Sequence, residues 1–160
     1  MPFTTAQLQT LKAAINAETD PVFVSDRIAG NTGAMGEFFN LDSTFNAWKT
    51  SVPITDIGDA INATELVGLT TGKLQQLQTI SDFSGGTINP SKADRRSAFD
   101  QVFAAASGTI TRPALLAVWK RFAKRGEKVF ATGAGTDAAP GNLVWEGSVG
   151  NNDIVAAIRS

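Results

Sequence analysis

The chain has 160 residues, a formal net charge of −1, and neither cysteine nor histidine. These absences exclude disulfides, a thiol nucleophile, thiolate metal sites and the usual histidine base or metal ligand. A nearly neutral chain is also a poor general binder of polyanions, and no apolar run approaches the roughly 20 residues of a membrane span.

The first helix is predicted from its own start signal. Thr4 stands at the N-cap position and Gln7 three residues later, which is the spacing of a capping box. Phe3 and Leu8 occupy the two positions of a hydrophobic staple, and an apolar stripe at helical spacing follows. We expect this helix to end before Asp20 and Pro21.

The next stretch gives weaker signals. Residues 28–36 are rich in glycine and predict a loop, which leads into a short helix around residues 37–41. Residues 45–53 fit either a helix or an extended segment, and both interpretations stay open. A short helix is predicted over residues 54–62, starting near Pro53 or Thr55.

Two further helices follow. Thr70 or Thr71 can cap the first, which carries an apolar face and ends at Gly85 and Gly86. Ser91 is the predicted N-cap of the second. The buried side chains expected on these two helices are Leu74, Leu77 and Ile80 on the first and Phe99, Val102 and Phe103 on the second.

A basic helix is predicted over residues 112–128, with Thr111 as its cap and Leu115, Trp119 and Phe122 facing inward. Lys120, Lys124 and Lys128 are four residues apart and would share one face. This face could be only a solvated surface. It could also contact a phosphate backbone, or a protein partner with an acidic rim.

The C-terminal part predicts strands. Residues 128–149 read as strand, glycine-rich loop and strand, which indicates a hairpin with a long, flexible tip near residues 132–142. The loop lacks the Gly-Lys-Ser/Thr ending of a phosphate-binding loop. A short final helix should be capped by Asn151 or Asn152. The predicted fold class is therefore mainly α: a small helical bundle over residues 1–128, with a β-hairpin arm and short helix over 129–160 in the same domain.

Charge is unevenly distributed along the chain. Residues 1–91 hold four Lys/Arg and nine Asp/Glu, whereas residues 92–128 hold nine and three. In a homo-oligomer, the acidic first half of one copy could meet the basic segment of its neighbour. The glutamates Glu37, Glu65, Glu127 and Glu146 show no spacing that singles out a catalytic pair, so we expect no enzyme, no cofactor and no metal site.

Four segments together carry a family resemblance: WKTSVPITDIGDAI, LTTGKLQQLQTI, NPSKADRRSAFDQVF and TRPALLAVWKRFAKRGEKVFATGAGTDAAP. They resemble a family of small proteins encoded in the virion-structure gene clusters of tailed bacteriophages and prophages, over nearly the full length. The resemblance implies a structural protein of the virion, made in the bacterial cytoplasm, with no catalytic motif and no membrane. A small helical bundle with an arm is similar in plan to the head–tail adaptors that ring the portal.

That resemblance implies three partners: other copies of the chain in a cyclic ring, the phage portal, and the next neck or tail protein. Loose contact with packaged DNA is also expected. The residues expected to make these contacts are Arg112, Lys120, Arg121, Lys124, Arg125, Lys128, Phe130 and Trp145. Two alternatives remain: another minor capsid or tail protein, and a nucleic-acid-binding module that uses the basic helix 112–128.

Overall fold

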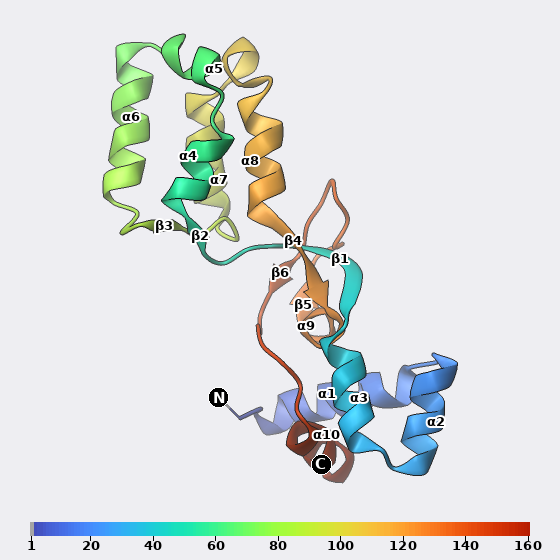
Figure 1. The fold of residues 1–160 in the computed structure, drawn as a ribbon. Coiled ribbons are helices and arrows are strands. Elements are labelled where there is room, and N and C mark those ends of the chain that lie inside the picture. Colours follow the sequence, from blue (N-terminus) through green and yellow to red (C-terminus); the bar gives the residue numbers. More distant parts are fainter. Residues whose placement is uncertain (1) are drawn as a thin grey trace. The chain divides into compact units, whose positions relative to one another are not determined.

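The computed structural model describes residues 2–160 and is mainly helical, with short strand pairs (Figure 1). The chain forms two compact units. The terminal unit comprises the residues up to Ala47 together with Phe122–Ser160, and the central unit is Trp48–Arg121. In residues 2–160, no helix combines the length and the apolar character required to cross a membrane.

The terminal unit contains the helices α1 (Thr5–Ala17), α2 (Pro21–Ala29), α3 (Thr32–Asn40), α9 (Arg125–Val129) and α10 (Asn151–Arg159). The predicted capping box of α1 is confirmed: the N–H of Gln7 donates to Thr4 Oγ1 at 3.3 Å, and the N–H of Thr4 donates to Gln7 Oε1 at 2.9 Å. Ala17 is the last residue of α1, before Asp20 and Pro21, as predicted.

The glycine-rich stretch 28–36 is not the loop that the sequence predicted, because α2 and α3 cover most of it. Gly30 alone takes the left-handed conformation, with φ 71°, and ends α2. Asn31 immediately caps the next helix, since its side-chain oxygen accepts from the N–H of Ala34. One residue of unusual φ is thus enough for the turn, and the other glycines sit inside α3.

The core of the terminal unit joins both ends of its chain. Helix α10 packs on α1 and α3, and α2 packs on α3. The buried side chains of this core are Leu11, Ile15, Phe23, Met35, Phe39, Val149, Ile154 and Ala157. Burial of this apolar area is the main favourable term for the unit.

The central unit contains α4 (Ile54–Ala60), α5 (Ala63–Val67), α6 (Thr71–Asp82), α7 (Ala93–Val102), a 3₁₀ turn (Ala105–Gly108) and α8 (Thr111–Trp119). The strands β2 (Val52–Pro53) and β3 (Thr87–Ile88) pair antiparallel, with Val52 opposite Ile88. The short helix expected over residues 54–62 is confirmed as α4.

The core of the central unit confirms most of the predicted apolar faces. Its buried side chains are Trp48, Val52, Ile57, Leu69, Ile88, Phe99, Val102, Phe103, Leu115 and Trp119. Several predictions for this unit are wrong. Leu74 is 40% exposed instead of buried, and α6 ends at Asp82, before Gly85 and Gly86. Phe122 is 56% exposed instead of facing inward. Lys92, and not Ser91, is the N-cap of α7, because the Ser91 hydroxyl instead donates to Asn89 Oδ1 at 2.5 Å.

The continuous basic helix over residues 112–128 is not present. Helix α8 ends at Trp119, and residues Lys120–Lys124 form strand β4, which pairs with β1 (Asp42–Trp48). Lys120 has the extended angles φ −105° and ψ 155°. Pairing with a distant strand overrides the local helical preference of the segment. Lys120, Lys124 and Lys128 therefore do not share one helix face.

The C-terminal segment contains one short antiparallel pair, β5 (Ala131–Thr132) with β6 (Asn142–Leu143). Residues 128 and 129 belong to α9, so the first expected strand is largely absent. The connecting loop is bound to β1: the N–H of Asn46 donates to Gly135 O at 2.7 Å, and the N–H of Gly141 donates to Asn46 O at 2.9 Å. Gly135 has φ 66°, and a Cβ there would lie 2.0 Å from Phe45 Cδ2, so the close approach requires glycine.

The last helix, α10, starts one residue earlier than predicted. Gly150 is its N-cap instead of Asn151 or Asn152. Its N–H donates to the carboxylate of Asp153 at 2.8 Å, and glycine offers no side-chain oxygen to the N–H groups of the first turn.

Candidate interaction site

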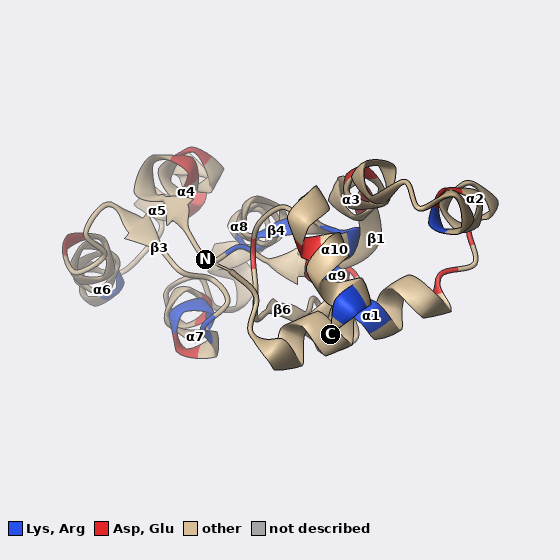
Figure 2. Ribbon diagram, turned by 90° about the horizontal axis from the view of Figure 1, so that it is seen from below, with Lys and Arg blue, Asp and Glu red and all other residues tan. Residues whose placement is uncertain are grey.

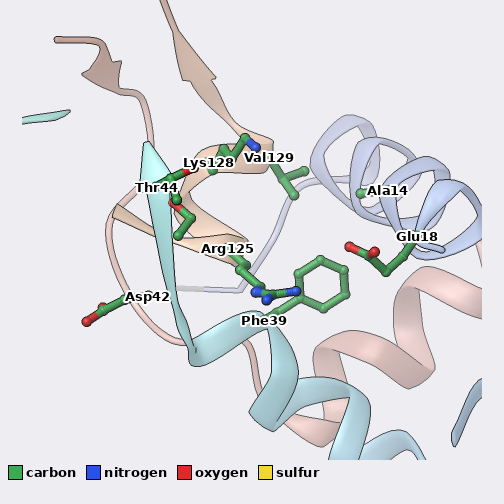
Figure 3. A pocket seen from close by; sticks show the side chains of 9 residues that line it. Ala14, Glu18, Phe39, Asp42, Thr44, Arg125, Lys128 and Val129 are labelled. Carbon is green, nitrogen blue, oxygen red and sulfur yellow. The ribbon is translucent and has the colours of Figure 1, made fainter. Parts of the chain in front are cut away.

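A pocket of about 500 Å³ opens in the terminal unit, between α1, α3, β1 and α9 (Figure 3). Basic, acidic, hydroxyl and apolar side chains all line it. The lining residues are Ala14, Glu18, Phe39, Asp42, Ser43, Thr44, Arg125, Lys128 and Val129. They come from four separate elements, so the pocket exists only in the folded unit.

Arg125 is the central charged group of this pocket. Its backbone N–H donates to Leu41 O at 2.8 Å, which fixes the start of α9. Its guanidinium carbon lies 4.0 Å from the centroid of the Phe38 ring, a cation–π contact. Within residues 2–160 the guanidinium has no hydrogen-bond or ion-pair partner. The contact with Phe38 therefore positions five N–H donors that the described chain leaves unused.

The two acids of the pocket do not neutralise Arg125 by direct contact. Glu18 Oε1 accepts from the N–H of Thr19 at 2.9 Å and from the N–H of Asp20 at 3.0 Å, so this carboxylate holds the turn between α1 and α2. Asp42 points away from the centre of the pocket in Figure 3. Lys128 is exposed and adds a second cation at the rim.

This arrangement can bind an anion attached to an apolar group. A guanidinium fork matches the two oxygens of a carboxylate, and Lys128 can contribute a point charge. Ala14, Phe39 and Val129 supply an apolar wall next to these cations. The site therefore places two cations beside an apolar wall.

The central unit holds a different pocket, an apolar groove of about 320 Å³ between α4, α6 and α7. Ile54, Ile57, Ile61, Leu77 and Phe99 line most of it. Its lining residues include no charged side chain, and its polar side chains are the hydroxyls of Thr55 and Ser81.

Glu65 of α5 performs a structural task in the central unit. Its carboxylate accepts from the backbone N–H groups of Ile110 and Thr111, each at 2.8 Å, and from the Thr109 hydroxyl at 3.0 Å. Desolvation raises the pKa of Glu65, but the hydrogen bonds from Thr111, Ile110 and Thr109 outweigh it and lower the pKa to about 2. The carboxylate therefore caps α8, whose own N-cap residue, Ile110, has no side-chain oxygen.

The structure divides the predicted basic site residues between the two units. Arg112, Lys120 and Arg121 belong to the central unit, whereas Lys124, Arg125 and Lys128 belong to the terminal unit. The Arg112 guanidinium contacts Asp100 at 2.9 Å, and Lys124 Nζ donates to Ser148 Oγ at 2.9 Å. Basic residues lie along β4 and acidic residues on α4 (Figure 2). Of the predicted cations, the structure brings Arg125 and Lys128 together in the pocket.

The two predicted aromatic site residues, Phe130 and Trp145, pack against the core of the terminal unit. Their ring centroids are 5.6 Å apart, and both rings contact Phe3, at 5.3 Å and 4.8 Å. Sequence reasoning missed Phe38, Phe39 and Glu18. These residues meet Arg125 only through tertiary structure, and no local spacing connects them to it.

Comparisons of the chain with protein-family models, with curated proteins and with solved structures found no match.

Proposed function

We propose that this chain is a structural component of a tailed-phage particle, and specifically the head–tail adaptor that joins the portal to the tail by assembling into a ring. The family resemblance of its four sequence segments supports the class of protein. The mainly helical fold agrees with an adaptor. We also propose that the helices form a bundle from which the C-terminal β5–β6 hairpin extends as an arm.

The observation that carries this proposal is the exposure of large apolar side chains on both units. Val67 is 84% exposed, Phe83 83% and Ile28 82%. Large apolar side chains exposed to this degree gain free energy when a neighbouring molecule covers them. A chain that acts by assembly covers such residues with its neighbours.

Of two alternatives, the first fits the observations less well and the second fits them equally. A nucleic-acid-binding module would use a continuous cationic helix face, and strand β4 interrupts that face. Another minor capsid or tail protein would use the same kind of contacts as an adaptor, and it differs in the number of copies in each particle.

Quantitative mass spectrometry of purified particles tests the proposal by counting this chain against the portal subunit. A ratio near one to one is expected for a ring matched to the portal. A large excess would instead place the chain in the capsid or the tail tube, and its absence from particles would overturn the proposed function.

A further inference from the structure

The end of α6 presents an acid and an aromatic ring that have no partner in the described chain. Asp82 is the last residue of α6 and Phe83 is its C-cap. Phe83 is 83% exposed, and Asp82 is exposed without a hydrogen bond or ion pair within residues 2–160. No basic residue lies in the last turn, where the helix dipole disfavours an anion. A cation from another molecule would relieve this cost.

Among the large apolar side chains of residues 2–160, the other two that are more than 80% exposed lie near acids that are already engaged. Ile28 follows Asp26, whose carboxylate accepts from the Asn31 side chain at 3.1 Å. Val67 follows Glu65, whose carboxylate caps α8. The pair Asp82 and Phe83 thus combines an available carboxylate with an exposed apolar group.

We propose that Asp82 and Phe83 of one copy insert into the Arg125 pocket of a second copy of this chain. The carboxylate pairs with the unused guanidinium donors of Arg125, and the phenyl ring packs on the apolar wall of the pocket. The local charges support this occupant, because Asp82 is an exposed carboxylate and the cations of the pocket are Arg125 and Lys128. The inference rests on the proposed function and specifies how the ring would be held together.

The contact is heterologous, because Asp82 and Phe83 belong to the central unit and the pocket belongs to the terminal unit. Each copy carries both surfaces and can bind one neighbour on each side. Such contacts generate a closed ring when the rotation between copies closes, and a filament otherwise. Association should also weaken with salt, since a charge pair orients the partners.

A charge swap in the full-length protein tests the contact. Asp82→Arg and Arg125→Glu should each weaken self-association at least about tenfold, measured by sedimentation velocity over a concentration series. The double variant Asp82→Arg/Arg125→Glu should regain association, and so should a mixture of the two single variants. Restoration excludes misfolding of Arg125→Glu as the cause. The matched control Asp59→Arg, at an exposed aspartate of α4, should associate like the wild type.

Disulfide trapping covers the case of a weak contact. The chain has no cysteine, so introduced thiols are the only ones present. Phe83→Cys mixed with Val129→Cys should give cross-linked pairs on mild oxidation, more than Phe83→Cys mixed with Ile28→Cys. A monomeric wild type without a cross-link above this control, or single charge variants that associate like the wild type, would overturn the proposed contact.

The two proposals fail separately. If particles contain the chain at the portal ratio but the charge variants associate normally, the contact is wrong and the proposed function stands. If the charge swap behaves as expected but particles lack the chain, the contact stands and the role in the particle is wrong.

Discussion

Gly126 is the residue whose replacement tests the packing next to the Arg125 pocket most directly. It lies in α9 and is buried. A Cβ at this position would lie 2.7 Å from Val149 Cγ2 and 3.2 Å from the backbone oxygen of Phe39. Ordinary contacts between carbon atoms are about 3.5–4.0 Å. Val149 is itself only 1% exposed, so neither neighbour can move away freely.

The magnitude of the effect follows from two opposing terms. Overpacking a core by a methyl group costs about 1–3 kcal/mol. Replacing glycine by alanine in a helix contributes about 0.5–1 kcal/mol in favour of folding. Gly126→Ala should therefore destabilise the terminal unit by about 1 kcal/mol net at the middle of these ranges, and lower the Tm by about 2–4 °C for a chain of this size.

Urea unfolding monitored by circular dichroism measures this loss, and hydrogen exchange assigns it to the terminal unit. Gly33→Ala in α3 is the matched control in the same unit, because a Cβ there meets nothing closer than Asn31 Oδ1 at 3.8 Å. It should be neutral or stabilising by up to about 1 kcal/mol. If Gly126→Ala were as stable as the wild type, the packing derived for α9 against α3 and Val149 would be refuted.

Two further predictions concern helix caps. Because the pKa of Glu65 is lowered to about 2 from 4.5, its contribution to stability is complete above pH 4.5 and is lost as the pH falls towards 2; urea titrations of the wild type and Glu65→Gln should differ above pH 4.5 and converge near pH 2. A constant difference at all pH values would show that the charge of Glu65 is not what matters. Thr4→Ala should cost about 1 kcal/mol in the same assay through loss of the α1 capping box, and an unchanged midpoint would contradict this.

The sequence alone predicts the features that depend on neighbouring residues. The capping box of Thr4 and Gln7 spans three residues, and the apolar positions Phe99, Val102 and Phe103 lie on consecutive turns. The capping box and the apolar spacing each lie within one segment, so both can be predicted without knowing what the segment packs against.

A helix cap that comes from a residue distant in the sequence could not be predicted from local spacing. Thr111 has the residue type of an N-cap, yet it is buried in the first turn of α8 and its hydroxyl accepts from the N–H of Asn62 at 3.0 Å. The donors at this helix start bind Glu65, which is 45 residues from Ile110 in the sequence. A carboxylate that approaches through the fold satisfies them as well as a local side chain does.

Tertiary structure also determines the conformation of the basic segment and the formation of the pocket. Residues Lys120–Lys124 have charges at helical spacing, but they form a strand because β1 provides a pairing partner; Ser43 Oγ donates to Ala123 O across 80 residues at 2.6 Å. Arg125 then starts a new helix and is held over Phe38. The sequence shows that the segment is cationic. Which of its cations line the pocket depends on the pairing of β4 with β1, because strand hydrogen bonds join residues that are far apart in the sequence.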